Sequence, residues 1–307
     1  MISFKCKTCG GEMSVDSSGA LVCEYCGGNA YFDDRQLAGY KEFRQQMLNY
    51  LKGVHESDDG RDEDRLWSNA EEKQLRTSDG ESVTIRYLYS YEDDAGSIYL
   101  TRKNAIFIYG SENKSKADKT LWSIKALSFP PADVKGLADC FPKLSGRYDL
   151  EDGGVMLTFE RTDNLFPLSL FGSLDPKHVA WIISRLENIC CVLNYSELVH
   201  GGISADSVWI NPFIHHAVLM GHWQSAMRTG ISGMKDQELS DLKDLRKTAE
   251  RILGNRKEEA PAALMDFLHG QPSEDAFSDF EKWDNVIEKG FGGRHFAGGL
   301  SINDLDV

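Results

Sequence analysis

Four cysteines near the N-terminus form two pairs whose spacing suits a metal ion. Cys6 and Cys9 are separated by two residues, as are Cys23 and Cys26, and thirteen residues lie between the pairs. Each pair can place two thiolates on one ion in a tight turn, and a glycine follows each pair. Four thiolates make a closed tetrahedral Zn²⁺ site with no position left for a substrate. We therefore expect a single structural zinc ion here.

The segment between the two pairs, "EMSVDSSGALV", is typical of a strand, a turn and a second strand, which would bring the pairs together. With its cysteines it resembles a zinc ribbon over residues 4–30. Two disulfides or an iron–sulfur centre are the alternatives, and disulfides are disfavoured in a cytosolic chain. A unit of this size buries too little core to fold alone, so the metal would supply its folding energy. We place this first domain at residues 1–32.

Composition excludes several classes of function. The 307 residues carry 48 acidic and 34 basic side chains, a net charge of -14, with no segregated basic patch. Such a surface repels phosphate backbones, so its electrostatics disfavour nucleic-acid binding. No apolar run approaches the ~20 residues of a membrane helix, and the first residues lack the apolar core of a signal peptide. We expect a cytoplasmic protein with no membrane partner.

A second group of potentially catalytic positions lies in "HGGISADSVWIN" (200–211) and "AVLMGHW" (217–223). The elements that must position them occur in a definite order. Three β-rich segments span 82–110, a helical stretch follows over 119–144, and a strand lies near 154–161. A long helix from about Pro176 to Tyr195 leads into the 200–211 loop, and a further helix covers 241–253.

This order resembles a protein kinase across residues 75–298. The resemblance implies an α+β fold with a β-rich small lobe at 73–171, a mostly helical large lobe at 172–299 and a flexible tail at 300–307. The tail ends in apolar and acidic residues and could serve as a docking peptide. Residues 33–72 would connect the ribbon to this body through an amphipathic helix and an acidic, solvated linker, "ESDDGRDEDR". The helix is expected to pack in cis, with partner binding as the alternative.

The catalytic loop of a kinase contains the triplet H-R-D, whose Asp accepts the proton of the substrate hydroxyl. The resemblance places this triplet on His200, Gly201 and Gly202, so the catalytic carboxylate is absent. The metal-binding Asn of the loop falls near Ser207, a poor Mg²⁺ ligand. Asp241 corresponds to the helix residue that anchors the backbone of the catalytic loop.

The metal-binding D-F-G triplet of kinases falls on Gly221, His222 and Trp223, which include no carboxylate. We expect His222 and Trp223 to fill the cleft that this leaves. ATP and Mg²⁺ are therefore not expected as ligands.

The small lobe also departs from the kinase pattern. Its phosphate-covering loop falls on "YEDDAGSIYL", which has one glycine, Gly96, and carries Asp93 and Asp94. A carboxylate ~4 Å from a phosphate is repelled by ~1 to 4 kcal/mol per charge pair. The phosphate-binding Lys falls at Tyr109, and the nearest alternative, Lys125, lies in a helical segment.

Residues of functional appearance elsewhere have structural interpretations. Cys190 and Cys191 are expected to be small buried apolar residues, and His215 and His216 to lie in a solvated turn. Asp206 is expected to cap the turn before "SVWI".

These features predict a catalytically inactive, kinase-like scaffold that binds partner proteins of unknown identity. An atypical phosphoryl or nucleotidyl transferase is the first alternative, which would depend on Asp206 or Asp241 and on Mg²⁺. A zinc-ribbon nucleic-acid-binding protein, in which Lys5 and Lys7 would matter, is the second.

Overall fold

The computed structural model describes residues 4–5, 12–15, 20–23, 29–31, 45–46, 48–50, 52, 61–129, 135–229 and 239–306. An antiparallel sheet with the order β1-β2-β3-β4 comes first, made of β1 (Phe4–Lys5), β2 (Glu12–Val15), β3 (Ala20–Cys23) and β4 (Asn29–Tyr31). Cys23, which ends β3, is buried. Cys6, Cys9 and Cys26 lie outside the described residues, so the zinc site stays a prediction.

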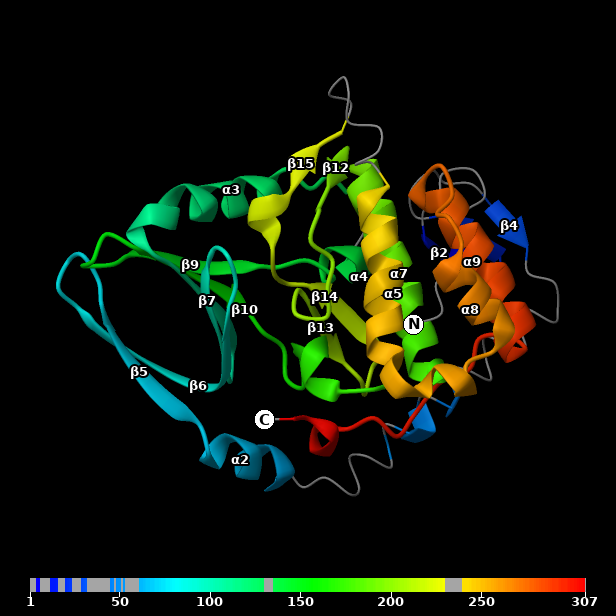
Figure 1. Ribbon diagram of the computed structural model, residues 1–307, viewed down its shortest axis with the longest axis horizontal. Coiled ribbons are helices and arrows are strands. Elements are labelled where there is room, and N and C mark those ends of the chain that lie inside the picture. The colour runs from blue at the N-terminus through cyan, green and yellow to red at the C-terminus, as the bar shows by residue number, and fades with distance from the viewer. Residues whose placement is uncertain are drawn as a thin grey trace.

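A six-stranded antiparallel sheet with the order β5-β6-β7-β8-β10-β9 forms most of the small lobe (Figure 1). Its strands are β5 (Glu71–Arg76), β6 (Ser82–Glu92), β7 (Gly96–Thr101), β8 (Asn104–Tyr109), β9 (Leu144–Asp149) and β10 (Val155–Glu160). Successive side chains of a strand point to opposite faces. Ile98 and Leu100 accordingly join the main core, while Tyr99 packs in a second cluster on the other face.

Helix α3 (Lys114–Lys125) follows the short helix η1 (Ser111–Asn113) and packs on strands β8 and β10. It also contacts η3 (Trp223–Ser225) of the large lobe, so it touches both lobes. The short helix α4 (Lys135–Ala138) precedes β9.

The large lobe is built around helix α5 (Pro176–Tyr195). Its beginning is specified locally, because the Asp175 side chain accepts hydrogen bonds from the N–H groups of Lys177 and His178, and proline occupies the first position. Most α5 side chains are buried, against α7 (Ser240–Leu253) and α9 (Ala276–Phe291) among others. The remaining helices are η2 (Leu168–Phe171), η4 (Gly254–Glu259) and α8 (Ala262–His269).

Two further small sheets are formed by strands between residues 166 and 228. One has the order β11-β13-β14, made of β11 (Phe166–Pro167), β13 (Val208–Asn211) and β14 (His216–Leu219). The other pairs β12 (Leu198–Val199) with β15 (Met227–Arg228). The 200–207 loop connects β12 to β13, and residues 220–226 connect β14 to β15.

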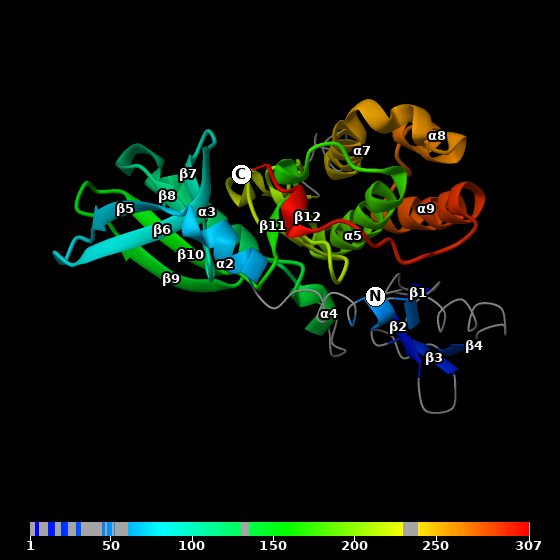
Figure 2. The ribbon, with the colours of Figure 1, turned by 90° about the horizontal axis from the view of Figure 1, so that it is seen from below.

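The chain after α9 returns across the large lobe, as Figure 2 shows. The ring of Phe296 stacks on that of His215 with centroids 4.3 Å apart, and His215 stacks on Trp181 at 4.5 Å. Tyr50, which precedes the small lobe in the chain, packs against Phe296 at 5.2 Å. Beyond η5 (Ile302–Asp304), the Asp306 N–H donates to the Leu170 carbonyl at 2.8 Å. We call residues 294–306 the C-terminal strap.

Three local expectations differ from the structure. The segment expected to be a solvated linker contains helix α2 (Arg61–Ser68), because Trp67 at its end is an apolar anchor and is only 5% exposed. The turn residue His215 is buried, since it is enclosed by the two stacked rings described above. Residues 300–306, expected to be a flexible tail, are held by η5 and the Leu170 contact.

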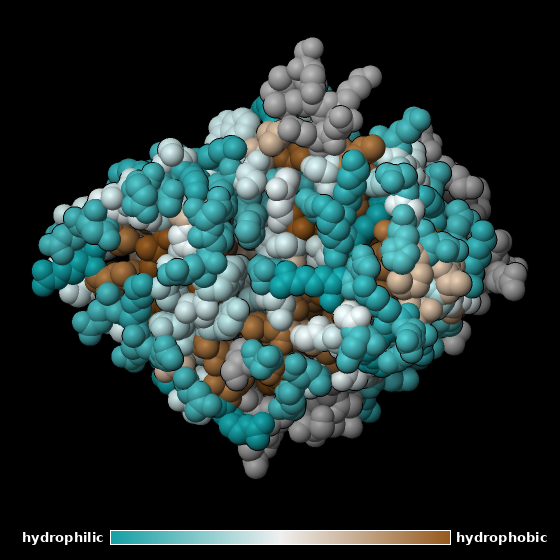
Figure 3. All heavy atoms as spheres, in the orientation of Figure 1, coloured by the Kyte–Doolittle hydropathy of each residue, from teal (hydrophilic) through white to brown (hydrophobic). Residues whose placement is uncertain are grey.

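No helix in the described part of the chain is long and apolar enough to cross a membrane. Figure 3 shows that hydrophilic side chains cover most of the face seen in Figure 1, with apolar side chains surfacing in smaller groups.

Candidate functional site

The side chain of Asp241, in the first turn of α7, binds the backbone of the loop after β12. One carboxylate oxygen accepts the His200 N–H at 2.7 Å, and the other accepts the Gly201 N–H at 2.8 Å. Burial raises the pKa of the Asp241 carboxyl to about 6, although the two N–H donors act to lower it. Both oxygens of this carboxylate therefore bind the loop backbone.

Two adjacent glycines shape the loop itself. Gly201 has a φ of 69°, in the left-handed region that side chains rarely adopt. Gly202 has no room for a side chain, since a Cβ there would lie 2.9 Å from the Cβ of His222. The positions that the kinase resemblance assigns to Arg and Asp are thus ones at which this backbone and its surroundings favour glycine.

The His200 side chain belongs to the core beneath the loop. Its Nε2 lies 2.9 Å from the Gly221 carbonyl oxygen, to which it must donate because a carbonyl only accepts. Its ring meets that of Trp223 edge to face at 4.8 Å. Complete burial lowers the pKa of His200 to about 3, so the ring is neutral at physiological pH.

The rest of the loop is closed by its own hydroxyl groups. Ser204 and Ser207 bond to each other, with the Ser204 N–H donating to the Ser207 Oγ at 2.8 Å and the Ser207 N–H to the Ser204 Oγ at 3.2 Å. Asp206, expected to cap this turn, instead pairs with Arg251 at 3.6 Å. The expectation was wrong because the Ser204 hydroxyl, and not the Asp206 carboxylate, accepts the N–H group of this turn.

The β6–β7 hairpin reaches down to this loop from the small lobe. The Tyr91 hydroxyl donates to the Asp206 carbonyl at 2.9 Å, and burial raises the pKa of Tyr91. At the hairpin tip, one Asp93 oxygen accepts the N–H groups of Ala95 at 2.8 Å and Gly96 at 2.9 Å. A phosphate-binding loop presents such N–H groups to its ligand, whereas here Asp93 already binds them.

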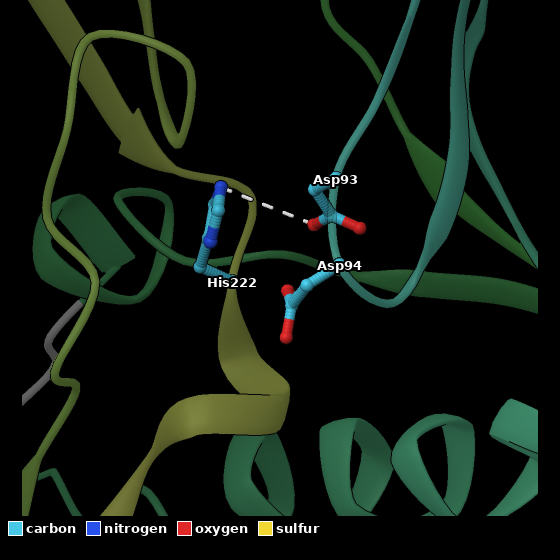
Figure 4. Close-up of side chains that lie close together, drawn as sticks. All are labelled: Asp93, Asp94 and His222. Carbon is cyan, nitrogen blue, oxygen red and sulfur yellow. Dashed lines mark ion pairs between the residues drawn. The ribbon is translucent and has the colours of Figure 1, made fainter.

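Three side chains converge where the hairpin tip meets the large lobe (Figure 4). Asp93, Asp94 and His222 each place a donor atom within 4.8 Å of the others. The His222 Nε2 lies 3.9 Å from an Asp93 oxygen, and Gln224 approaches both carboxylates at 3.4 Å. Lys116 of α3 pairs with Asp94 at 3.3 Å. Slight desolvation acts to raise the pKa of the exposed Asp94 carboxyl, but its hydrogen bond and charge contact with Lys116 hold that pKa below its ordinary value.

The other predicted positions of the small lobe have structural roles. The Tyr109 hydroxyl lies 3.1 Å from the Thr120 Oγ1 of α3, and Tyr109 is buried. At Gly96, a Cβ would lie 2.0 Å from the Ile108 carbonyl oxygen, so this glycine permits close pairing with β8. Lys125, considered as the phosphate-binding residue, is exposed in the last turn of α3.

The structure brings together most of the predicted positions of the large lobe. The His200 ring lies beside Gly202, Gly221 and Trp223, and Gly202 in turn lies beside His222. Trp223 is 1% exposed. Its indole N–H donates to the Leu219 carbonyl at 2.9 Å.

Sequence reasoning missed three residues of this region, namely Tyr91, Lys116 and Gln224. Each contacts a residue far away in the chain, for which one sequence carries no signal. Only the alternation of aromatic residues in "RYLYSYE" places Tyr91 on the face of the strand shared with Tyr89.

Comparison with known proteins gave structural similarity alone. No family model matches the chain, and no curated protein matches it. Among solved structures, a vaccinia related kinase 3 aligns with a TM-score of 0.49 and 14% identity, over 71% of this chain and 91% of that one. A rhoptry kinase from Toxoplasma gondii aligns with a TM-score of 0.47 and 9% identity, over 72% and 84%. At these values we transfer no property of either protein to this chain.

Proposed function

We propose that this protein is a catalytically inactive, kinase-like module that acts as a scaffold or adaptor for partner proteins. The proposal rests on the interior of the cleft and on the two-lobed α+β arrangement. It includes the predicted structural zinc site at Cys6, Cys9, Cys23 and Cys26 and a cytoplasmic location.

The observation that carries the proposal is the packing at Gly202. Phosphoryl transfer by a kinase-like fold needs a carboxylate at this position of the loop to accept the hydroxyl proton. The His222 side chain occupies the space into which such a carboxylate would project, with Cβ atoms 2.9 Å apart. The packing of the large lobe therefore leaves too little space for a side chain at the position of the catalytic group.

The distribution of charge supports the same conclusion. A nucleotide and its metal ions require carboxylates on the large lobe and N–H or cationic groups on the small lobe. Here the carboxylates of Asp93 and Asp94 lie on the small lobe, where Asp94 pairs with Lys116 at 3.3 Å, and the large lobe places His222 and Gln224 beside them. Triphosphate oxygens in the usual pose would face two negative charges.

A direct test is a thermal-shift titration with ATP, with and without Mg²⁺, on the full chain. A ligand at ~100 times its Kd stabilises the native state by ~2.7 kcal/mol, which is easily observed. We expect no shift at millimolar nucleotide. A Mg²⁺-dependent shift would contradict the proposal, and its disappearance in an Asp206→Asn variant would favour the transferase. The exposed-site variant Asp266→Asn serves as the control, because Asp266 lies on α8, outside the cleft.

A further inference from the structure

The cluster of Asp93, Asp94 and His222 has the composition of a metal site as well as the position of a contact between lobes. Its two carboxylates and one imidazole come from the hairpin tip and from the segment after β14. Asp93 is largely enclosed, with 9% of its side chain exposed, whereas His222 retains 24% and Asp94 retains 71%. A cation could thus be bound deeply by Asp93 and still be reached from solvent past His222.

The remaining carboxylate oxygens of the cluster have long contacts that a bound cation would replace. Asp94 Oδ2 lies 3.3 Å from the Lys116 Nζ, and Asp94 Oδ1 lies 3.4 Å from the Gln224 Nε2. One Asp93 oxygen is taken up by the N–H groups of Ala95 and Gly96, which orients the carboxylate. Its other oxygen faces His222 at 3.9 Å and Gln224 at 3.4 Å, both longer than a good charge-assisted hydrogen bond. The 3.9 Å between the His222 Nε2 and the Asp93 oxygen suits an ion bound between them better than direct contact, since ligand atoms ~2.0–2.2 Å from a shared metal are ~3–4 Å apart.

We propose that Asp93, Asp94 and His222 bind one divalent first-row cation in the range from Mn²⁺ to Zn²⁺, with water completing its coordination. Imidazole and carboxylate together suit these ions, whereas Mg²⁺ prefers oxygen ligands alone. The ion fastens the β6–β7 hairpin to the large lobe and holds the cleft closed. It requires no nucleotide, so this site is independent of whether the cleft has catalytic activity.

The experiment uses Mn²⁺ alone as the probe, added to the full chain without nucleotide. Mn²⁺ lies below Zn²⁺ in the affinity order of divalent metals, so it does not displace zinc from thiolates. A titration measures the amount of bound Mn²⁺, with the free ion quantified by its electron paramagnetic resonance signal. We expect a saturable site in the wild type and at least ~10-fold weaker binding in Asp93→Asn and His222→Asn.

These substitutions preserve the local backbone. Asparagine at 93 keeps an oxygen for the Ala95 and Gly96 N–H groups, and asparagine at 222 tolerates the φ of 63° found there. His295→Asn is the matched control, because His295 is exposed and lies on the strap. It should bind Mn²⁺ as the wild type does.

Hydrogen exchange of the backbone amides of residues 93–97 measures whether the ion attaches the β6–β7 hairpin to the large lobe. Mn²⁺ should slow exchange there in the wild type and in His295→Asn, but not in the two site variants. The proposal is overturned if the wild type shows no saturable binding, or if His222→Asn binds Mn²⁺ as tightly as the wild type.

Discussion

The crowding at Gly202 makes a sharp prediction, because two effects of opposite sign compete there. Gly202→Ala adds only a Cβ, which would lie 2.9 Å from the Cβ and 3.5 Å from the Cγ of His222. Gly202 does not have a positive φ, so the backbone itself accepts alanine. Glycine to alanine at such a position stabilises by ~0.4–1 kcal/mol through the unfolded chain. Overpacking of a filled site costs ~1–3 kcal/mol, so the crowding should win.

We therefore expect Gly202→Ala to lower the free energy of unfolding by ~1–2 kcal/mol. His222→Gly removes the obstructing side chain and suits the left-handed backbone at that position. In this second background Gly202→Ala should become neutral or stabilising by up to ~1 kcal/mol. The double-mutant cycle should give a coupling free energy of ~1–3 kcal/mol, as found for residues in contact.

Urea unfolding of the four proteins in the cycle measures this coupling, and the midpoints are comparable if the denaturant slopes agree. A coupling near zero, or a Gly202→Ala variant more stable than the wild type, would refute the claim that His222 occupies this space. Gly202→Asp in the His222→Gly background then tests the chemistry. We expect no phosphoryl transfer from ATP, since restoring a single group leaves the rest of the machinery absent.

Three further predictions concern the framework of the site. Burial places the pKa of both His200 and His215 at about 3, below the ~6.5 of an unfolded chain, so the unfolded state takes up protons first on acidification. Each histidine should therefore lower the free energy of unfolding by ~2 kcal/mol between pH 7 and pH 5. Urea unfolding at the two pH values measures this loss, which should be smaller in a His215→Asn variant. Asp241→Ala leaves two loop N–H groups without their acceptor and should destabilise by ~3–5 kcal/mol, measured in the same way; a loss under ~1 kcal/mol would mean that the loop has other support. Phe296→Ala removes the outer ring of the His215 stack and should speed proteolysis of the strap while the rest of the chain stays resistant; unchanged cleavage would show that the stack does not hold it.

The large lobe was largely predictable because its signals are local. The proposed span of α5 coincides with the observed one, and Asp175 followed by Pro176 is a strong helix start. Strands β6, β7 and β8 follow from their β-branched and aromatic residues. By contrast, β5 has the sequence "EEKQLR", whose strand state depends on pairing with β6 rather than on its own propensity.

The site was predictable in its parts but not in its assembly. Alignment to the kinase pattern places His200, Gly202 and His222 in order along the chain. Nothing in one sequence shows that His222 fills the space beside Gly202, or that Asp93 lies opposite His222 from the other lobe. His215 was misjudged for the same reason, since the two rings that enclose it belong to α5 and to the strap.

The C-terminal strap has a consequence for how the chain acquires its structure. The Phe296 N–H bonds to the Gln46 side chain and the Gly299 N–H to the Tyr50 hydroxyl, contacts that span 250 and 249 positions. Pairings of such long sequence separation form late, because the chain entropy of closing the loop must be lost first. During synthesis these contacts must wait until residues 296–299 have emerged. The stack on Trp181 would then complete the large lobe only at the end of folding, and a shortened chain would leave that aromatic surface uncovered.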